Sequence, residues 1–164
     1  MSQRFKKIYL TIMVVVPFLA YSGYYYYEMI RKAPFSFEGF RTILVDFQAP
    51  GGRATQIDVA GGTVAYTLPD GEIYRDTISF DAQELQEFHR ALYTNNFFEL
   101  PHRMQNEGSR DTTTGVYRIE AVYDRKQYRV VYETNYRGER RHKDKVERVI
   151  AYIESNVKKK LEGR

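Results

Sequence analysis

Residues 116–134 read VYRIEAVYDRKQYRVVYET, and this segment carries the clearest structural signal in the chain. Val116–Tyr123 and Tyr128–Thr134 are rich in apolar and aromatic residues, and these alternate with charged residues in the middle of the first run and at the start of the second, as is typical of β-strands. The four polar residues Asp124–Gln127 lie between the two runs and predict a tight turn. We therefore expect an antiparallel β-hairpin here.

A helix is predicted on each side of this hairpin. Downstream, from about Asp144, apolar residues recur at the spacing of an amphipathic helix, at Val146, Val149, Ile150, Ile153 and Val157. Upstream, Asp81 and Glu84 form a D-x-x-E variant of the capping box, and apolar residues follow at helical spacing up to Leu92. Both helices have one apolar face, so both need a sheet or another helix to cover it.

Four further strands precede the first helix. They are predicted at Thr42–Phe47, Thr55–Val59, Thr63–Leu68 and Ile73–Phe80, with a turn at residues 69–72 (PDGE). The order of strands, helix, hairpin and helix predicts an α+β domain in which two helices pack on a sheet of antiparallel strands.

The amino-terminal segment has a different character. Ile8–Tyr27 contains no charged residue over 20 positions, enough for one helix to cross a hydrocarbon core of ~30 Å. This predicts an N-terminal transmembrane helix; the alternative is a cleaved signal peptide, in which Ala20 and Ser22 form an A-x-S cleavage site. The expected organisation is residues 1–32 for the flank and membrane span (about 8–27), 33–39 for a connector, 40–157 for the α+β domain and 158–164 for a basic tail.

Two sets of residues in this helix are candidate interaction sites. Val16, Ala20, Gly23 and Tyr27 recur along one helical stripe, and the small residues among them predict packing against a partner helix. The tyrosines of the range 24–27 suit an aromatic belt at the membrane interface: Tyr24, Tyr25, Tyr26 and Tyr27.

Charge is distributed unevenly over the 164 residues. The formal net charge of +4 divides into +3 for residues 1–39, −4 for 40–134 and +5 for 135–164. Contact with anionic lipid headgroups is one interpretation of the basic C-terminal part, and a solvated tail is the other. The candidate lipid contacts are Arg140, Arg141, Lys143, Lys158, Lys159 and Lys160. The acidic middle opposes a nucleic-acid partner, so we expect none.

Residue sets for catalysis are missing from the sequence. The chain has no cysteine, and its three histidines, His89, His102 and His142, form no H-E-x-x-H or i,i+4 pair. The glycine pairs at 51–52 and 61–62 do not fit a phosphate-binding loop and predict turns. We therefore expect no catalytic, metal-binding or cofactor-binding residue, no cofactor and no enzymatic activity, with His89 as a solvated surface histidine.

A family resemblance rests on three segments. Ala60–Gly62, the run Phe97–Pro101 (FFELP) after the first helix, and Tyr117–Ala121 follow one another as in the emfourin-like domains, small bacterial domains typified by an inhibitor of thermolysin-type metallopeptidases. The similarity covers about residues 57–157. It implies an α+β fold and a non-catalytic role.

Together these features predict a non-catalytic, single-pass accessory subunit of a bacterial inner membrane, with its domain in the periplasm. Its helix and domain would dock onto a larger membrane protein complex, respiratory or photosynthetic, and stabilise it. The alternative is a membrane-tethered emfourin-like peptidase inhibitor or peptide-binding module that uses the polar loop His102–Gly115.

Overall fold

The computed structural model describes residues 3–31, 35–68, 70–108 and 113–163, with side chains of the first helix described at Tyr9 and residues 12–26. The chain divides into two units, with the boundary in the sequence between Phe35 and Ser36. The first contains helix α1 (Gln3–Arg31), and the second contains every strand and the remaining helices of the described part.

Helix α1 corrects the predicted membrane span. Among the described residues, no helix is long and apolar enough to cross a membrane. The transmembrane helix, the single-pass topology and the inner-membrane location were therefore wrong predictions. The uncharged run contains six tyrosines together with Ser22 and Gly23, and these lower its mean hydropathy.

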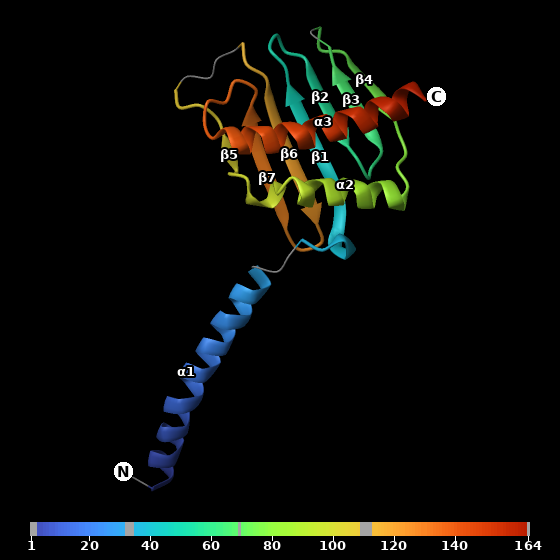
Figure 1. The fold of residues 1–164 in the computed structure, drawn as a ribbon. Helices are drawn as coiled ribbons and strands as arrows, with labels where there is room; N and C mark the ends of the chain where they lie inside the picture. Colours follow the sequence, from blue (N-terminus) through green and yellow to red (C-terminus); the bar gives the residue numbers. More distant parts are fainter. Residues whose placement is uncertain (1–2, 32–34, 69, 109–112, 164) are drawn as a thin grey trace. The chain divides into compact units, whose positions relative to one another are not determined.

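The second unit is an α+β domain built on a seven-stranded sheet (Figure 1). The strand order is β4-β3-β2-β1-β6-β7-β5, and neighbouring strands are antiparallel except β5 and β7, which are parallel. The strands are β1 (Phe40–Gln48), β2 (Ala54–Asp58), β3 (Thr63–Thr67), β4 (Ile73–Thr77), β5 (Arg103–Met104), β6 (Val116–Tyr123) and β7 (Gln127–Glu133). The predicted hairpin is β6–β7, and the sheet is mixed rather than antiparallel because of the short strand β5.

Two helices, α2 (Ala82–Thr94) and α3 (Arg140–Glu162), cover one face of this sheet (Figure 1). The predicted capping box of α2 is confirmed: the Glu84 backbone N–H donates to Asp81 Oδ1 at 2.8 Å, and the Asp81 N–H donates to Glu84 Oε2 at 2.8 Å. Helix α3 begins four residues before the predicted start and continues to Glu162. The lysines at 158–160 therefore belong to its last turns and not to a separate tail.

The core lies between the two helices and the sheet. Side chains from the central strands meet the apolar faces of α2 and α3. The 3₁₀ helix η2 (Phe97–Glu99) adds the buried Phe97, whereas η1 (Phe37–Gly39) has no buried residue. Side chains with at most 2% exposure include Ile43, Phe88, Leu92, Phe97, Leu100, Ile119, Val130, Tyr132, Val149 and Ile153. The opposite face of the sheet is polar, with Arg118 Nη1 at 2.8 Å from Asp46 Oδ2 and Arg129 Nη2 at 2.7 Å from Glu120 Oε2.

Candidate functional site

A row of aromatic side chains crosses the helix-covered face of the sheet in register. Tyr74, Tyr66, Thr55, Phe47, Tyr117 and Tyr132 occupy directly opposed positions on β4, β3, β2, β1, β6 and β7. Neighbouring rings are stacked, with 6.5 Å between the centroids of Tyr66 and Tyr74, 4.2 Å for Phe47 and Tyr117, and 6.4 Å for Tyr117 and Tyr132. We call this row the aromatic ladder; Thr55 is its one step without a ring.

Helix α3 is hydrogen-bonded to one end of the ladder. Tyr117 Oη donates to Glu154 Oε1 at 2.9 Å, and Tyr132 Oη donates to Glu147 Oε1 at 2.6 Å. Burial, together with the hydrogen bond to a carboxylate, raises the pKa of both hydroxyls well above the ordinary tyrosine value. The protonated tyrosines thus fix α3 across the sheet.

These shifted pKa values predict a loss of stability in alkaline solution. A tyrosine whose pKa is higher in the folded state than in the unfolded state, where it is about 10, stabilises the native state. This stabilisation is complete below pH 10 and is lost as the pH rises above 10. We expect the urea midpoint to fall between pH 8 and pH 11. The Tyr117→Phe/Tyr132→Phe double variant should show a smaller fall over the same range. An equal fall in both proteins would contradict the assignment.

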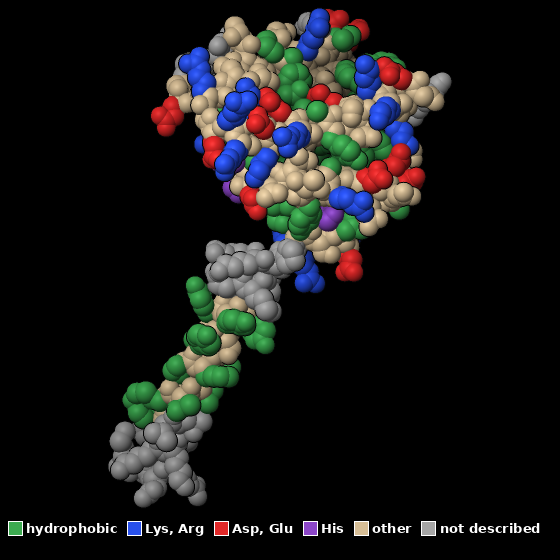
Figure 2. All heavy atoms as spheres, in the orientation of Figure 1, with side chains coloured by type: hydrophobic (Ala, Val, Ile, Leu, Met, Phe, Trp, Pro, Cys, Tyr) green, Lys and Arg blue, Asp and Glu red, His purple; other side chains and the backbone are tan. Residues whose placement is uncertain are grey.

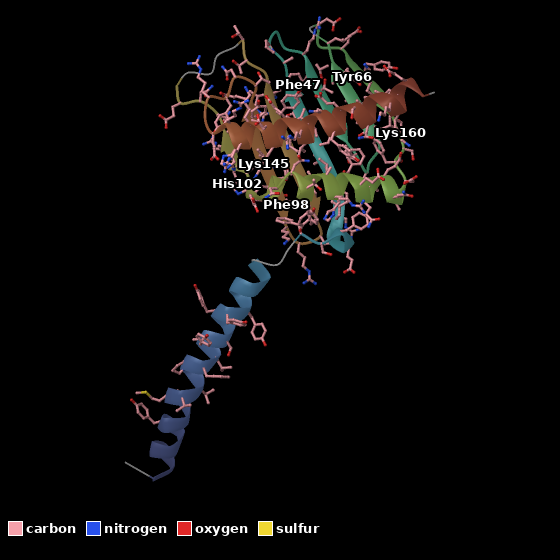
Figure 3. All side chains as sticks on the ribbon, viewed as in Figure 1. Phe47, Tyr66, Phe98, His102, Lys145 and Lys160 are labelled. Carbon is pink, nitrogen blue, oxygen red and sulfur yellow. The ribbon has the colours of Figure 1, made fainter. Side chains whose placement is uncertain are left out.

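A groove lies at the ringless step of the ladder. Its volume is about 390 Å³. Its lining residues are Val45, Phe47, Thr55, Ile57 and Tyr66 from the sheet, and Glu154, Val157, Lys158 and Leu161 from the C-terminal half of α3. Phe47 and Tyr66, labelled in Figure 3, flank Thr55 on the neighbouring strands. We call this groove the ring slot.

The outer edge of β4 is the second notable surface. Leu68 N donates to Glu72 O at 2.8 Å, and Ile78 N donates to Gly62 O at 2.8 Å, so even-numbered residues turn their backbone groups toward β3. The backbone groups of Ile73 and Arg75 consequently face away from the sheet. We use β4 edge for the outward side of Ile73–Thr77.

Large apolar side chains stand exposed at this edge. Ile73 is 57% exposed, Tyr74 61% and Leu68, in the preceding turn, 43%. Ile73 and Tyr74 are consecutive in a strand and therefore lie on opposite faces of the sheet. The opposite edge is different, because β5 has only two residues and follows Pro101 closely.

A basin of about 620 Å³ on the polar face of the sheet is a weaker candidate. Arginines and acids line it in equal number: Arg75, Arg118 and Arg129 with Asp46, Asp58 and Glu120. Two of the arginines are paired with two of the acids. Since the charges balance, the basin does not select an anion or a cation, and we assign no ligand to it.

His89 lies among aromatic rings on helix α2. His89 is half-buried, with its ring centroid 5.5 Å from Phe37, 5.6 Å from Phe40, 5.0 Å from Tyr93 and 5.9 Å from Tyr123. The prediction of a solvated surface histidine was therefore wrong, because β1 and η1 bring aromatic rings to this helix face. Within the described ranges, no group of three or more His, Asp or Glu residues could hold a metal ion.

The predicted stripe and belt on α1 gain no partner from the described structure. Val16 is 56% exposed, Ala20 is exposed, and open space surrounds Gly23. The side chain of Tyr27 lies outside the described residues. Tyr24, Tyr25 and Tyr26 are also exposed. Their interpretation as a membrane-interface belt depended on the span and is withdrawn with it.

The six basic residues proposed to contact lipid do not form one patch. Arg140, Arg141 and Lys143 begin α3 and Lys158–Lys160 end it, about 27 Å away at 1.5 Å per residue. Several have acidic neighbours: Lys143 Nζ lies 3.9 Å from Glu147 Oε1, and Lys160 Nζ lies 2.7 Å from Glu84 Oε1. Basic and acidic side chains are interspersed over this side of the domain (Figure 2). The six residues thus lie at the two ends of one helix, among acidic side chains.

The FFELP segment has a structural role. Phe97 is fully buried, Leu100 is 1% exposed, and Tyr128 Oη donates to the Leu100 carbonyl at 2.6 Å. These contacts attach η2 to β7. No protein-family model matches the chain, and no curated protein matches it. The resemblance to the emfourin-like domains therefore stays a prediction.

Proposed function

We propose that the domain is a non-catalytic protein-binding module that accepts an extended segment of another protein along the β4 edge. The observation that carries this proposal is the outward-facing backbone of Ile73 and Arg75 at the end of a seven-stranded sheet. Strand addition of this kind obtains affinity from main-chain hydrogen bonds and specificity from alternate side chains.

The β4 edge has two charged residues, Arg75 and Asp76, but lacks the other usual protections against strand addition. Native edges are blocked by proline, lysine, bulges or very short strands. β4 pairs with β3 in unbroken register over all five residues, and its sequence, IYRDT, contains neither proline nor lysine. Because the Thr77 N–H donates to Asp76 Oδ1 at 2.7 Å, the backbone offered to a partner is that of Ile73 and Arg75, which supports a short strand.

Charge opposes a second copy of the same chain as that partner. When a two-fold axis relates two paired β4 edges, the helix-covered faces of both sheets lie on the same side. The axis then lies beside one residue of the strand, and this residue is opposite its own copy. An axis at Tyr74 sets Glu72 opposite Asp76 of the second copy. Axes at Arg75 and at Asp76 set each of these residues opposite its own copy. Like charges in opposed positions destabilise these three registers, which favours a foreign segment.

The same residues define the chemistry of the segment. Glu72 and Asp76 flank Tyr74 on the helix-covered side of the strand, so basic side chains of the partner suit this side. On the other side, Ile73 favours an apolar side chain opposite it. The expected partner is an extended stretch in which basic and apolar residues alternate.

Proline substitution at the edge tests this function. A displayed library of unrelated seven-residue peptides is selected on the full chain, and the selected peptides are titrated against Arg75→Pro and Arg75→Ala. Proline removes only an outward N–H, which an edge strand tolerates. We expect Arg75→Pro to weaken binding at least ten-fold and Arg75→Ala, which keeps the N–H, to weaken it much less.

Three results would contradict the proposal. One is equal affinity of the selected peptides for both variants. Another is a wild-type dimer that Arg75→Pro dissociates in sedimentation analysis, which would assign the edge to a second copy. A third is inhibition of thermolysin by the wild type and by Arg75→Pro alike, which would favour the activity implied by the emfourin resemblance.

A further inference from the structure

The ring slot is a separate feature from the β4 edge, and its geometry follows from the aromatic ladder. All positions in this row except Thr55, from Tyr74 on β4 to Tyr132 on β7, carry a ring. Thr55 on β2 leaves the space above its own strand unfilled, between Phe47 and Tyr66. We infer that the ring slot binds the planar aromatic side chain of another polypeptide, which completes the ladder.

The spacing of the strands suits a ring. Adjacent strands lie about 4.8 Å apart, so β1 and β3 are separated by about 9.6 Å. Two contacts between carbon atoms at about 3.5–4.0 Å require about 7–8 Å between the walls. Side chains stand roughly perpendicular to a sheet. Phe47 and Tyr66 therefore leave room for one planar group between them, and Figure 3 shows both at the same end of the sheet.

The rest of the slot is apolar. Val45 and Ile57, at most 6% exposed, oppose each other one row along the same strands from Phe47 and Thr55, and Val157 and Leu161 of α3 also line the slot. An aromatic ring in this position would exchange water for apolar contacts on both of its faces, which is the favourable environment for stacked rings.

Charge at the rim argues against a cation as occupant. Glu154 Oε1 already accepts a hydrogen bond from Tyr117, and Lys158 contributes a positive charge whose Nζ lies 3.6 Å from Glu162 Oε1. The rim thus carries no net negative charge to attract a lysine or an arginine. An uncharged aromatic side chain fits both the walls and the rim, because the main-chain amides of its residue remain outside the slot, near these polar groups.

The chain offers a direct assay because it contains no tryptophan. N-acetyl-L-tryptophanamide is titrated with the full-length protein, and its fluorescence is excited at a wavelength that spares tyrosine. We expect a saturable blue shift. Thr55→Phe places a ring in the slot from inside the protein and should weaken binding at least ten-fold. The matched control is Gln56→Phe, which adds the same ring to the same strand on the other face and should leave the affinity within two-fold of wild type.

The Tyr66→Leu variant tests whether Thr55→Phe weakens binding only indirectly. This variant removes one wall while leaving Thr55 unchanged, and it should also weaken binding. Equal affinity of wild type and Thr55→Phe would overturn the inference, as would loss of binding in Gln56→Phe. Tighter binding of N-acetyl-L-argininamide, followed by nuclear magnetic resonance shifts, would overturn the choice of an uncharged ring. None of these results depends on the β4 edge, so the two proposals succeed or fail separately.

Discussion

The Gly62→Ala variant is expected to lose at least about 3 kcal/mol of unfolding free energy, enough to threaten a domain of ordinary stability. Gly62 has a φ of +65°, and an added Cβ would lie 2.2 Å from the carbonyl oxygen of Ile78. The added carbon would clash with backbone atoms, and a change of side-chain rotamer cannot relieve such a clash. The change would also disturb the hydrogen bond from Ile78 N to Gly62 O at the start of the β3–β4 pair. Urea unfolding followed by circular dichroism measures the loss.

A substitution at Gly71 distinguishes the cost of a left-handed backbone from the cost of a steric clash. Gly71 has a φ of +86°, and an added Cβ there meets nothing within 4 Å. Gly71→Ala carries the cost of a left-handed backbone alone, about 1 kcal/mol. If both variants lose the same free energy, the close approach of Ile78 is not the cause.

Phe97→Ala is expected to cost about 3–5 kcal/mol, the usual range for removing a buried phenylalanine. Phe97 is fully buried, and its ring centroid lies 5.8 Å from those of Tyr128 and Phe98. Truncation leaves a cavity at the junction of η2 and β7, where the Tyr128 hydroxyl also reaches the Leu100 carbonyl. Unfolding in urea again gives the size of the effect.

The neighbouring phenylalanine provides the comparison. Phe98 is half-buried, although it also contacts several rings. Phe98→Ala should therefore cost clearly less than Phe97→Ala, because part of its surface is already in water. A larger loss for Phe98→Ala would mean that the exposed side of η2, and not its buried side, holds the segment in place.

Local patterns predicted the local elements of the domain. The alternation in Val116–Tyr123 gave β6 with its observed bounds, and the Asp81–Glu84 pair gave the start of α2. The start of α3 was missed because Arg140, Arg141 and Lys143 place positive charge at a helix N-terminus, where the helix dipole disfavours it, and the Glu139 side chain makes no capping hydrogen bond.

The two candidate surfaces depend on pairing between distant strands, which periodicity does not reveal. Phe47, Thr55 and Tyr66 become neighbours only once the registers of β1, β2 and β3 are fixed. The open edge likewise requires knowledge that β4 ends the sheet. The sequence showed aromatic residues within the predicted strands, but it did not identify Thr55 as the position of the aromatic ladder that lacks a ring.

The placement of β1 has a consequence for how the domain folds. β1 pairs with its sequence neighbour β2 on one side and with β6, whose paired residues lie 68 to 83 positions later, on the other. The meander of β1–β4 can form early, but it then exposes a bare strand and an uncovered apolar face until β6, β7 and α3 have left the ribosome. Non-local pairing of this kind slows folding and lengthens the exposure of aggregation-prone surface. We expect nascent chains that end before β6 to remain dependent on chaperones.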